Sequence, residues 1–241
     1  EEVLPDLPEK ITTDVPFVLS EEEAVLQKKI KQEILFDIQA TDISKIERPM
    51  NLQYTIAKFQ RLRMLADSLE LLGDNKKSSK LEVLKELLQE NVEDDRKVII
   101  FSEFAQMCKI LKRELAQYNP LMIIGEVPDK ERQEIVDKFN GDPKHKILVM
   151  SSAGKFGLNL QVADTIINYD LPFSLATIEQ RVGRAHRLLQ KKKVHVFNLL
   201  GEKTADMAIQ KIIHAKRELS GQLLGDLPVS MEDLKEMLLF E

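Results

Sequence analysis

The sequence predicts an α/β fold in which helices cover both faces of a parallel sheet. Between residues 95 and 200, short apolar runs such as KVIIF and KILVM alternate with stretches of helical pattern. Continuous apolar runs are typical of strands that are buried on both faces of a parallel sheet. Gly, Pro, Asn and Asp separate several of the runs from the helices. This alternation favours parallel strands joined by right-handed crossovers.

The composition permits a folded core and restricts the kinds of partner. Hydrophobic residues make up 43% of the chain, which is enough for a folded core. A length of 241 residues corresponds to one or two domains. The 35 Lys and Arg residues are outnumbered by 40 Asp and Glu residues, so the net charge is −5. A chain of this charge is not a polybasic nucleic-acid binder, and any contact with phosphate must come from local patches.

Cysteine usage and hydropathy indicate the compartment. Cys108 is the only cysteine, which excludes an intramolecular disulfide and suits a reducing environment. No apolar run reaches the length of a membrane span, and the first residues, EEVLPDLPEK, lack the pattern of a signal peptide. We therefore expect an intracellular protein that does not enter a membrane.

The first third of the chain is predicted to be mainly helical. Residues 1–19 carry three prolines and an alternating apolar pattern that indicates a short strand. Ser20, followed by three glutamates, is a favourable start for a helix. Pro49 is expected to end helical structure. We predict helices over residues 20–38, 52–72 and 80–90, with Gly73 ending the second and Ser78 or Ser79 capping the third.

The remaining elements follow the alternation of strands and helices. The expected strands are residues 97–101, 121–124, 146–150, 165–169 and 194–200. The expected helices are residues 103–118, residues 129–139 with Gly141 as the C-cap, an arginine-bearing helix capped by Ser174, and residues 204–225 and 231–240. We divide the chain into a linker and helical segment (1–90), the domain that contains the sheet (91–225) and a C-terminal amphipathic helix (226–241).

A basic stretch, TIEQRVGRAHRLLQKKK, occupies residues 177–193. Arg184 and Arg187 are three residues apart, so a helix would place both guanidinium groups on one face. The planar fork of arginine donors matches the oxygen atoms of phosphate. A basic helix in solvent would explain an isolated pair of this kind. The Gly-rich turn SSAGKFGLN upstream favours a phosphate site instead.

Polar residues follow three of the predicted strands, at the end where ligands bind in open parallel sheets. They are Ser102, the loop Ser151–Asn159 and the turn Asp170–Ser174. In the loop, Gly154 and Gly157 allow a backbone to approach closely, and Ser151 and Ser152 add hydroxyl donors. This arrangement suits the phosphate of a nucleic-acid backbone or of a nucleotide. A tight turn that needs small residues is the alternative.

The dipeptide Gly154-Lys155 resembles the end of a phosphate-binding P-loop but does not complete the motif. A P-loop needs Gly where Val149 stands and Ser or Thr where Phe156 stands. No Asp-Glu pair follows an apolar strand, as a magnesium site of this kind would require. The chain thus combines arginines suited to phosphate with no site of its own for Mg-ATP. We infer half of a composite site, with the arginines supplied across a cleft.

The stretches KVIIFSEF, ILVMSSAGKFGLNLQVADTIINYD and EQRVGRAHRLLQ resemble the second RecA-like lobe of superfamily-two helicases, and most of all the Swi/Snf-type DNA translocases. The resemblance covers nearly the whole chain. It implies that Arg184 and Arg187 are the arginine fingers of motif VI, which begins at Gln180. It also implies a motif V, which couples the ATP site to DNA, at Gly157, Leu158 and Asn159. Contacts with nucleic acid are expected at Ser102, Ser151, Ser152, Gly154 and Lys155.

The resemblance implies the C-terminal lobe (91–225) of an ATP-driven translocase on double-stranded DNA. ATP and Mg2+ would be held mainly by the N-terminal lobe of the same parent chain, and a nucleoprotein or polymerase complex is a further expected partner. Arg181 and Gly183 follow the wider helicase pattern R-x-G-R, and Leu189 stands where Gly is usual. His186 is expected to orient the helix or touch the partner lobe. A lobe of an RNA-directed helicase and a non-catalytic scaffold lobe are the alternatives.

Overall fold

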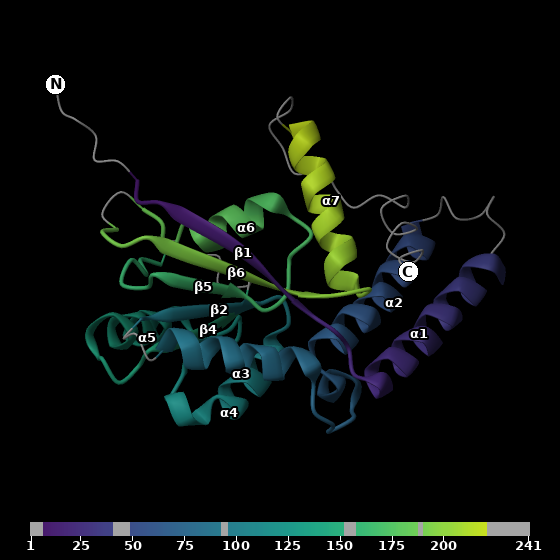
Figure 1. Cartoon of the computed structure of the whole chain (residues 1–241), viewed down its shortest axis with the longest axis horizontal. Coiled ribbons are helices and arrows are strands. Elements are labelled where there is room, and N and C mark those ends of the chain that lie inside the picture. Colours follow the sequence, from purple (N-terminus) through teal and green to yellow (C-terminus); the bar gives the residue numbers. More distant parts are fainter. Residues whose placement is uncertain (1–6, 41–48, 93–95, 152–157, 188–189, 221–241) are drawn as a thin grey trace. The chain divides into compact units, whose positions relative to one another are not determined.

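The protein contains a six-stranded parallel sheet (Figure 1), as the sequence predicts. The computed structural model describes residues 7–40, 49–92, 96–151, 158–187 and 190–220. The order of the strands is β1-β6-β5-β2-β4-β3. In this order, right-handed crossovers place α4 on one face of the sheet and α5 and α6 on the other.

The strands β2 to β6 lie within a residue or two of the apolar runs that predict them, whereas β1 begins earlier than the alternating pattern that indicates it. They are β1 (Lys10–Phe17), β2 (Val98–Ser102), β3 (Leu121–Ile123), β4 (Ile147–Ser151), β5 (Thr165–Asn168) and β6 (Val194–Gly201). The helices are α1 (Glu21–Ala40), α2 (Pro49–Asp67), α3 (Ser79–Val92), α4 (Ala105–Glu114), α5 (Asp129–Gly141), α6 (Leu175–Val182) and α7 (Ala205–Ser220), and the short 3-10 helices are η2 (Leu69–Leu72) and η3 (Ala116–Tyr118).

The middle of the sheet forms the core. Every residue of β2, β4 and β5 is buried, which explains why their sequences are apolar without alternation. Residues of these strands join one apolar cluster that includes Ile99, Phe101, Leu148, Met150 and Ile166. A rigid core of this kind holds the ends of the strands in fixed positions.

Contacts divide the chain into two compact units. The first comprises Glu1–Val15, Val83–Pro172 and Ala176–Leu199, and the second comprises Pro16–Glu82, Phe173–Leu175 and Leu200–Glu241. The boundaries that we place at residues 90 and 225 stay predictions. Most of β1 belongs to the unit that contains the sheet, and β1 pairs with β6 even though it precedes the other strands by about eighty residues.

Pro49 begins a helix instead of ending one, which corrects the prediction. The first residues of a helix do not need their N–H groups for intrahelical bonds, so Pro is tolerated there. The predicted helix over residues 52–72 is also interrupted, because α2 ends at Asp67. Ser68 is extended, and its side chain accepts a hydrogen bond from the Glu70 N–H at 3.2 Å, which begins η2. Gly73 adopts φ of 87° and ends η2, as expected of a C-cap glycine.

Two other helix ends differ from the sequence predictions. The helix α4 ends at Glu114 and is followed by η3, whereas one helix was expected up to residue 118. The helix α5 continues through Gly141, and the extended Asp142 is its C-cap. Gly141 is therefore not the left-handed cap that we expected, since the Asp142 N–H completes the last turn by donating to Lys138.

One buried carboxylate serves the starts of two helices. Ser20 caps α1 as predicted, because its Oγ accepts from the Glu23 N–H at 3.3 Å and Glu23 Oε2 accepts from the Ser20 N–H at 2.8 Å. This is a capping box. Glu23 also accepts hydrogen bonds from the N–H of Ser79, at 3.1 Å, and from its hydroxyl. The first turn of α3 is thereby joined to the first turn of α1.

A buried ionic cluster joins three helix ends within the second unit. Lys80, at the start of α3, has no exposed surface, and its Nζ donates to Asp67 Oδ1 at 2.7 Å and to Asp206 Oδ2 at 2.8 Å. Asp67 ends α2 and Asp206 lies in the first turn of α7. Asp206 also accepts from the Gly201 N–H at 3.2 Å. The ammonium group therefore holds together two carboxylates that would otherwise repel each other.

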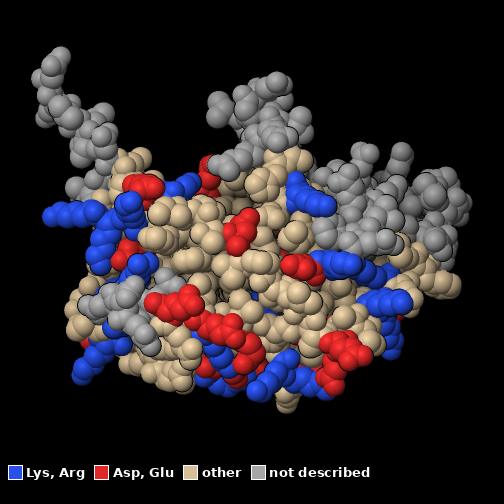
Figure 2. Space-filling model, in the orientation of Figure 1, with Lys and Arg blue, Asp and Glu red and all other residues tan. Residues whose placement is uncertain are grey.

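The charged residues on the face drawn in Figure 2 are of mixed sign, with Lys and Arg interspersed among Asp and Glu. This agrees with the nearly balanced composition. Among the described helices, none combines the length with the apolar character that a membrane span requires.

We expect Lys80→Met to lower the free energy of unfolding by about 3–5 kcal/mol, because it removes the ammonium group that lies between two buried carboxylates. Urea unfolding followed by circular dichroism would measure this. Lys76→Met is the matched control, since Lys76 forms exposed ion pairs with Glu22 and Asp74 and its loss should leave the unfolding midpoint nearly unchanged. Equal effects of the two substitutions would contradict the structural role of the cluster.

Candidate functional site

The carboxyl ends of β2, β4 and β5 meet at one edge of the sheet. Ser102 at the end of β2 lies opposite Ser151 at the end of β4, and Phe101 lies opposite Asn168 of β5. Ser102 has no exposed surface, and its Oγ donates to Asp170 Oδ2 at 2.5 Å. Three of the predicted groups of polar residues are therefore brought together, as the rule for parallel sheets requires.

The two serines differ in how their hydroxyls are used. Besides donating to Asp170, the Ser102 Oγ accepts from the Phe104 N–H at 3.2 Å. A direct contact of Ser102 with a nucleic-acid phosphate stays a prediction, and it would require the hydrogen bond to Asp170 to open. The hydroxyl of Ser151 is buried and has no hydrogen-bond partner among the described residues.

Four predicted site residues lie outside the described residues. They are Ser152, Gly154, Lys155 and Gly157. Leu158 and Asn159 follow them and are described. Leu158 packs against the apolar cluster of the sheet, and Asn159 is exposed. The Asn159 Oδ1 accepts from the Gln161 N–H at 3.3 Å, so this side chain orders the turn in which it lies.

The arginine-bearing helix is shorter than predicted. The helix α6 ends at Val182, so Arg184 and Arg187 lie on turns beyond it and not on one helical face. The Gly183 N–H still donates to Glu179, four residues back, but the N–H groups of Arg184 and Ala185 donate three residues back. This tightening is typical of the end of a helix.

Hydrogen bonds to a distant segment explain why the helix ends there. The Arg184 carbonyl accepts from the Leu160 N–H at 3.2 Å. The Gln190 amide donates to the carbonyls of Gln161, at 2.8 Å, and Ala163, at 2.9 Å. These bonds hold Arg184 and Gln190 next to residues 160–163, a position that a continuing helix would not give them. The structure thus brings the arginine segment beside the segment that follows Asn159.

Arg184 carries a charge that its surroundings destabilise. Its side chain is partly buried, and burial lowers the pKa of the guanidinium, with the positive charges of Arg187 and Arg181 adding to the effect. An anion bound at this position would offset each of these costs. Arg187 is exposed, and its Nε donates to the Gly183 carbonyl at 2.8 Å. Gln180 is exposed on α6.

Three further residues of the stretch, Lys192, Lys193 and His186, have acidic neighbours or a backbone contact. Lys192 Nζ lies 3.1 Å from Asp164 Oδ2, and Lys193 Nζ lies 2.7 Å from Glu9 Oε2. This contact with Lys193 holds the pKa of Glu9 below its usual value. A ring nitrogen of His186 lies 2.6 Å from the carbonyl oxygen of Pro8, next to Glu9. The basic stretch therefore also anchors the segment that leads into β1.

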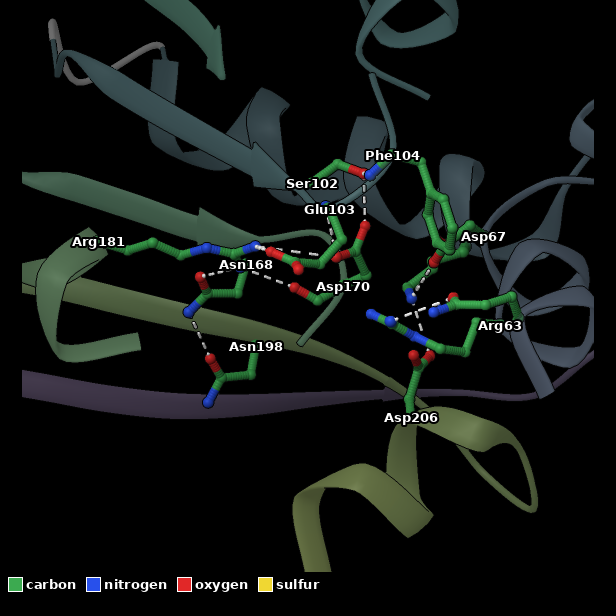
Figure 3. Close-up of polar contacts among 12 residues, drawn as sticks. Arg63, Asp67, Ser102, Glu103, Phe104, Asn168, Asp170, Arg181, Asn198 and Asp206 are labelled. Carbon is green, nitrogen blue, oxygen red and sulfur yellow. Dashed lines mark hydrogen bonds and ion pairs between the residues drawn. The ribbon is translucent and has the colours of Figure 1, made fainter. Parts of the chain in front are cut away.

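A buried arginine that sequence reasoning did not assign to the site lies at its base (Figure 3). Arg181 is 2% exposed, and its Nη1 donates to Asn168 Oδ1 at 3.0 Å and to the Asp170 carbonyl at 2.9 Å. Its Nη2 lies 2.6 Å from Glu103 Oε1. The sequence contains a signal for this contact. Polar residues stand at the ends of two apolar strands, and a helix that carries basic residues follows the second of them.

No metal centre is visible in the part of the chain that the structure describes. There, no group of three or more His, Cys, Asp and Glu side chains is arranged to hold a metal ion. The carboxylates at the sheet edge, Glu103 and Asp170, are instead bound to Arg181, Ser102 and the backbone.

Comparison with known proteins identifies this arrangement. Residues 79–189 match the model of the helicase conserved C-terminal domain. The SWI2/SNF2 ATPase C-terminal domain of Sulfolobus solfataricus superposes with a TM-score of 0.76 at 23% identity, covering 97% of this chain and all of that domain. Residues 79–189 thus correspond to a helicase conserved C-terminal domain, and the chain is similar in fold to the SWI2/SNF2 ATPase C-terminal domain.

Two further matches extend over most of the chain. The SWI2/SNF2 ATPase core of S. solfataricus in complex with double-stranded DNA has a TM-score of 0.78 and 26% identity, over 98% of this chain and 51% of that one. An uncharacterized ATP-dependent helicase of Mycoplasma genitalium is 30% identical over 220 residues, which is 90% of this chain. The chain spans about a fifth of the length of such curated relatives.

Cys108, on α4, is expected to be chemically inert in the folded helicase domain. Burial raises the pKa of its thiol to about 12, with the nearby negative charge of Asp170 adding to the shift. The thiolate, which is the reactive form, is therefore nearly absent at pH 8. Ellman's reagent should not react with the native protein at that pH and should react at once after unfolding in guanidinium. Rapid reaction before unfolding would contradict the burial of this helix face.

Proposed function

We propose that the chain is the C-terminal lobe of an ATP-driven motor that moves along double-stranded DNA. The observation that carries the proposal is the state of Arg184. Its guanidinium is partly buried beside like charges, on a turn fastened to the edge of the sheet, and this favours the binding of an anion. The similarity to a SWI2/SNF2 ATPase core in complex with double-stranded DNA supports the choice of motor and track.

The residues of this chain fit the phosphate end of ATP. Phosphoryl transfer develops negative charge on the transferring group, and arginines that reach it across a cleft accelerate the reaction by about 10³–10⁵-fold. Arg184 and Arg187 are the groups that would supply this positive charge. Gln180, exposed on α6, belongs to the same proposed site. Mg2+ is expected to be held by acidic residues of the N-terminal lobe of the parent protein.

The end of β4 is the proposed contact with DNA. The Ser151 hydroxyl is buried there without a partner among the described residues, at the entrance to the Gly-rich loop. Hydroxyl and backbone donors that bind phosphate oxygens hold a duplex without reading its sequence. Binding of this kind weakens as salt rises. The expected partners are therefore duplex DNA, the N-terminal lobe and an intracellular nucleoprotein or polymerase complex on which the motor acts.

The function is tested by ATP hydrolysis in the full-length parent protein. Turnover should rise strongly with duplex DNA, and less with single-stranded DNA or RNA. This 241-residue chain alone should hydrolyse no ATP, because it supplies only the arginine side of the site. Stimulation by RNA alone would assign the lobe to an RNA-directed helicase, and no hydrolysis with any nucleic acid would favour the scaffold alternative. Robust turnover by the chain alone would contradict the half-site.

Arg184→Ala in the full-length protein should reduce DNA-stimulated turnover by about 10³-fold or more while duplex binding persists. Arg184→Lys should restore little, because a lysine keeps the charge but lacks the planar fork. Steady-state hydrolysis and fluorescence anisotropy with labelled duplex would measure the two properties. Arg113→Ala is the control, since Arg113 is an exposed arginine of α4 paired with Glu114. Near-normal turnover of Arg184→Ala would remove Arg184 from its proposed role.

A further inference from the structure

Arg181 differs from the two arginines that follow it, because it is buried and both of its Nη atoms are bound to protein groups. Its guanidinium makes three hydrogen bonds, to Asn168, Asp170 and Glu103, with nitrogen to oxygen distances of 2.6 to 3.0 Å. It also lies over the ring of Phe101, 5.3 Å from the centroid. A guanidinium held in this way is not available to a phosphate, although it stands in the same basic stretch as Arg184.

The groups that bind Arg181 are themselves held in place. The Asp170 Oδ1 accepts from the Glu103 N–H at 2.8 Å, and its Oδ2 accepts from the Ser102 hydroxyl. Asn168 donates to Asn198 Oδ1 at 2.8 Å. The binding site for the guanidinium is therefore built from the carboxyl ends of β2 and β5 and is supported by β6 (Figure 3).

The hydrogen bonds continue across the sheet to its edge strand. Asn198 of β6 donates to Asp14 Oδ1 of β1 at 2.8 Å. A continuous path of side-chain contacts thus runs from Asp14 through Asn198 and Asn168 to Arg181, and from there to Glu103. The path contains side chains of β1, β6 and β5 and reaches Glu103 just after β2, so Arg181 is held by contacts outside α6.

Arg181 is linked directly to the turn that carries Arg184. Arg181 is in the last turn of α6, and its carbonyl accepts from the Arg184 N–H at 3.3 Å. The other end of that turn is held by the bond from the Leu160 N–H to the Arg184 carbonyl. The backbone of Arg184 is therefore fixed on one side through Arg181 and on the other through Leu160.

We propose that Arg181 is a positioning residue whose ion pair with Glu103 sets the end of α6, and with it the place of the Arg184 guanidinium. The proposal rests on the role of Arg184 in hydrolysis given above. A charged group buried among acidic partners keeps its place strongly, since moving it would leave charges of both signs uncompensated. Rates of phosphoryl transfer depend on such placement, because a displacement of about 1 Å costs about 10²-fold.

The test compares variants of the full-length protein in DNA-stimulated hydrolysis. Arg181→Ala should lower kcat by about 10²-fold and leave the KM for ATP unchanged, because the residue touches neither ligand. Arg181→Lys should recover part of the rate, since an ammonium can still pair with Glu103 but cannot make the other two hydrogen bonds. Glu103→Gln should lower kcat less, and combining it with Arg181→Ala should add little, because both remove the same interaction.

Arg132→Ala is the matched control for loss of a buried arginine. Arg132 lies on α5, is 7% exposed, and pairs with Asp129 at 2.8 Å and with the Gly125 carbonyl. It should reduce thermal stability without lowering kcat at a temperature where the protein is folded. An equal loss of kcat in Arg132→Ala and Arg181→Ala would show a general effect of destabilisation and would overturn the proposal.

The remaining outcomes separate this inference from the proposed function. If Arg184→Ala retains turnover, the role given to Arg184 in the proposed function fails, whatever Arg181→Ala does. If Arg184→Ala is inactive and folded Arg181→Ala turns over normally, only the positioning role is overturned. A raised KM with unchanged kcat would make Arg181 a ligand contact and also overturn it. Should Arg181→Ala not fold, Glu103→Gln decides, since its side chain is partly exposed and keeps its size, and a normal kcat there would overturn the proposal.

Discussion

Parallel pairing brings the carboxyl ends of all the strands to one edge of the sheet, and the polar residues that end β2, β4 and β5 must meet there. The buried strands leave these residues little freedom, because their apolar side chains fill the core on both faces. The polar groups have to satisfy one another or bind a ligand. Ser102 and Asp170 form a hydrogen bond with each other, whereas the Ser151 hydroxyl has no partner among the described residues.

The sheet was predictable from the sequence because burial on both faces leaves a continuous apolar run. The helix ends were less predictable, since contacts distant in the sequence decide them. Nothing local in the basic stretch shows that Gln190 binds the carbonyls of Gln161 and Ala163, and this contact keeps Arg184 and Arg187 off a common helical face. Pro49 was misjudged for another reason, because the same residue ends one helix and begins another according to what precedes it.

The partners of Arg181 also lie far from it in the chain. Glu103 is 78 residues away, so the sequence shows a basic residue in a basic stretch where the structure shows a buried ion pair. Arg181 and Arg184, three residues apart in one motif, therefore differ in burial and in the charges that surround them. Arg181 is bound by several acceptors, whereas the pKa of Arg184 is lowered by partial burial and, to a smaller extent, by its positive neighbours. The net charge of −5 reveals neither of these environments.

The position of β1 determines how the domain responds to a mechanical load. It lies parallel to β6 at the edge of the sheet, with hydrogen bonds at both ends, from the Val194 N–H to the Glu9 carbonyl and from the Glu202 N–H to the Phe17 carbonyl. A force applied along the chain before Lys10 pulls on this strand along its own axis. Its bonds to β6 are then loaded in shear and must yield together, whereas a strand peeled from its end loses them one at a time. A pulling force on the residues before β1 would therefore be transmitted to β6 and to the rest of the sheet.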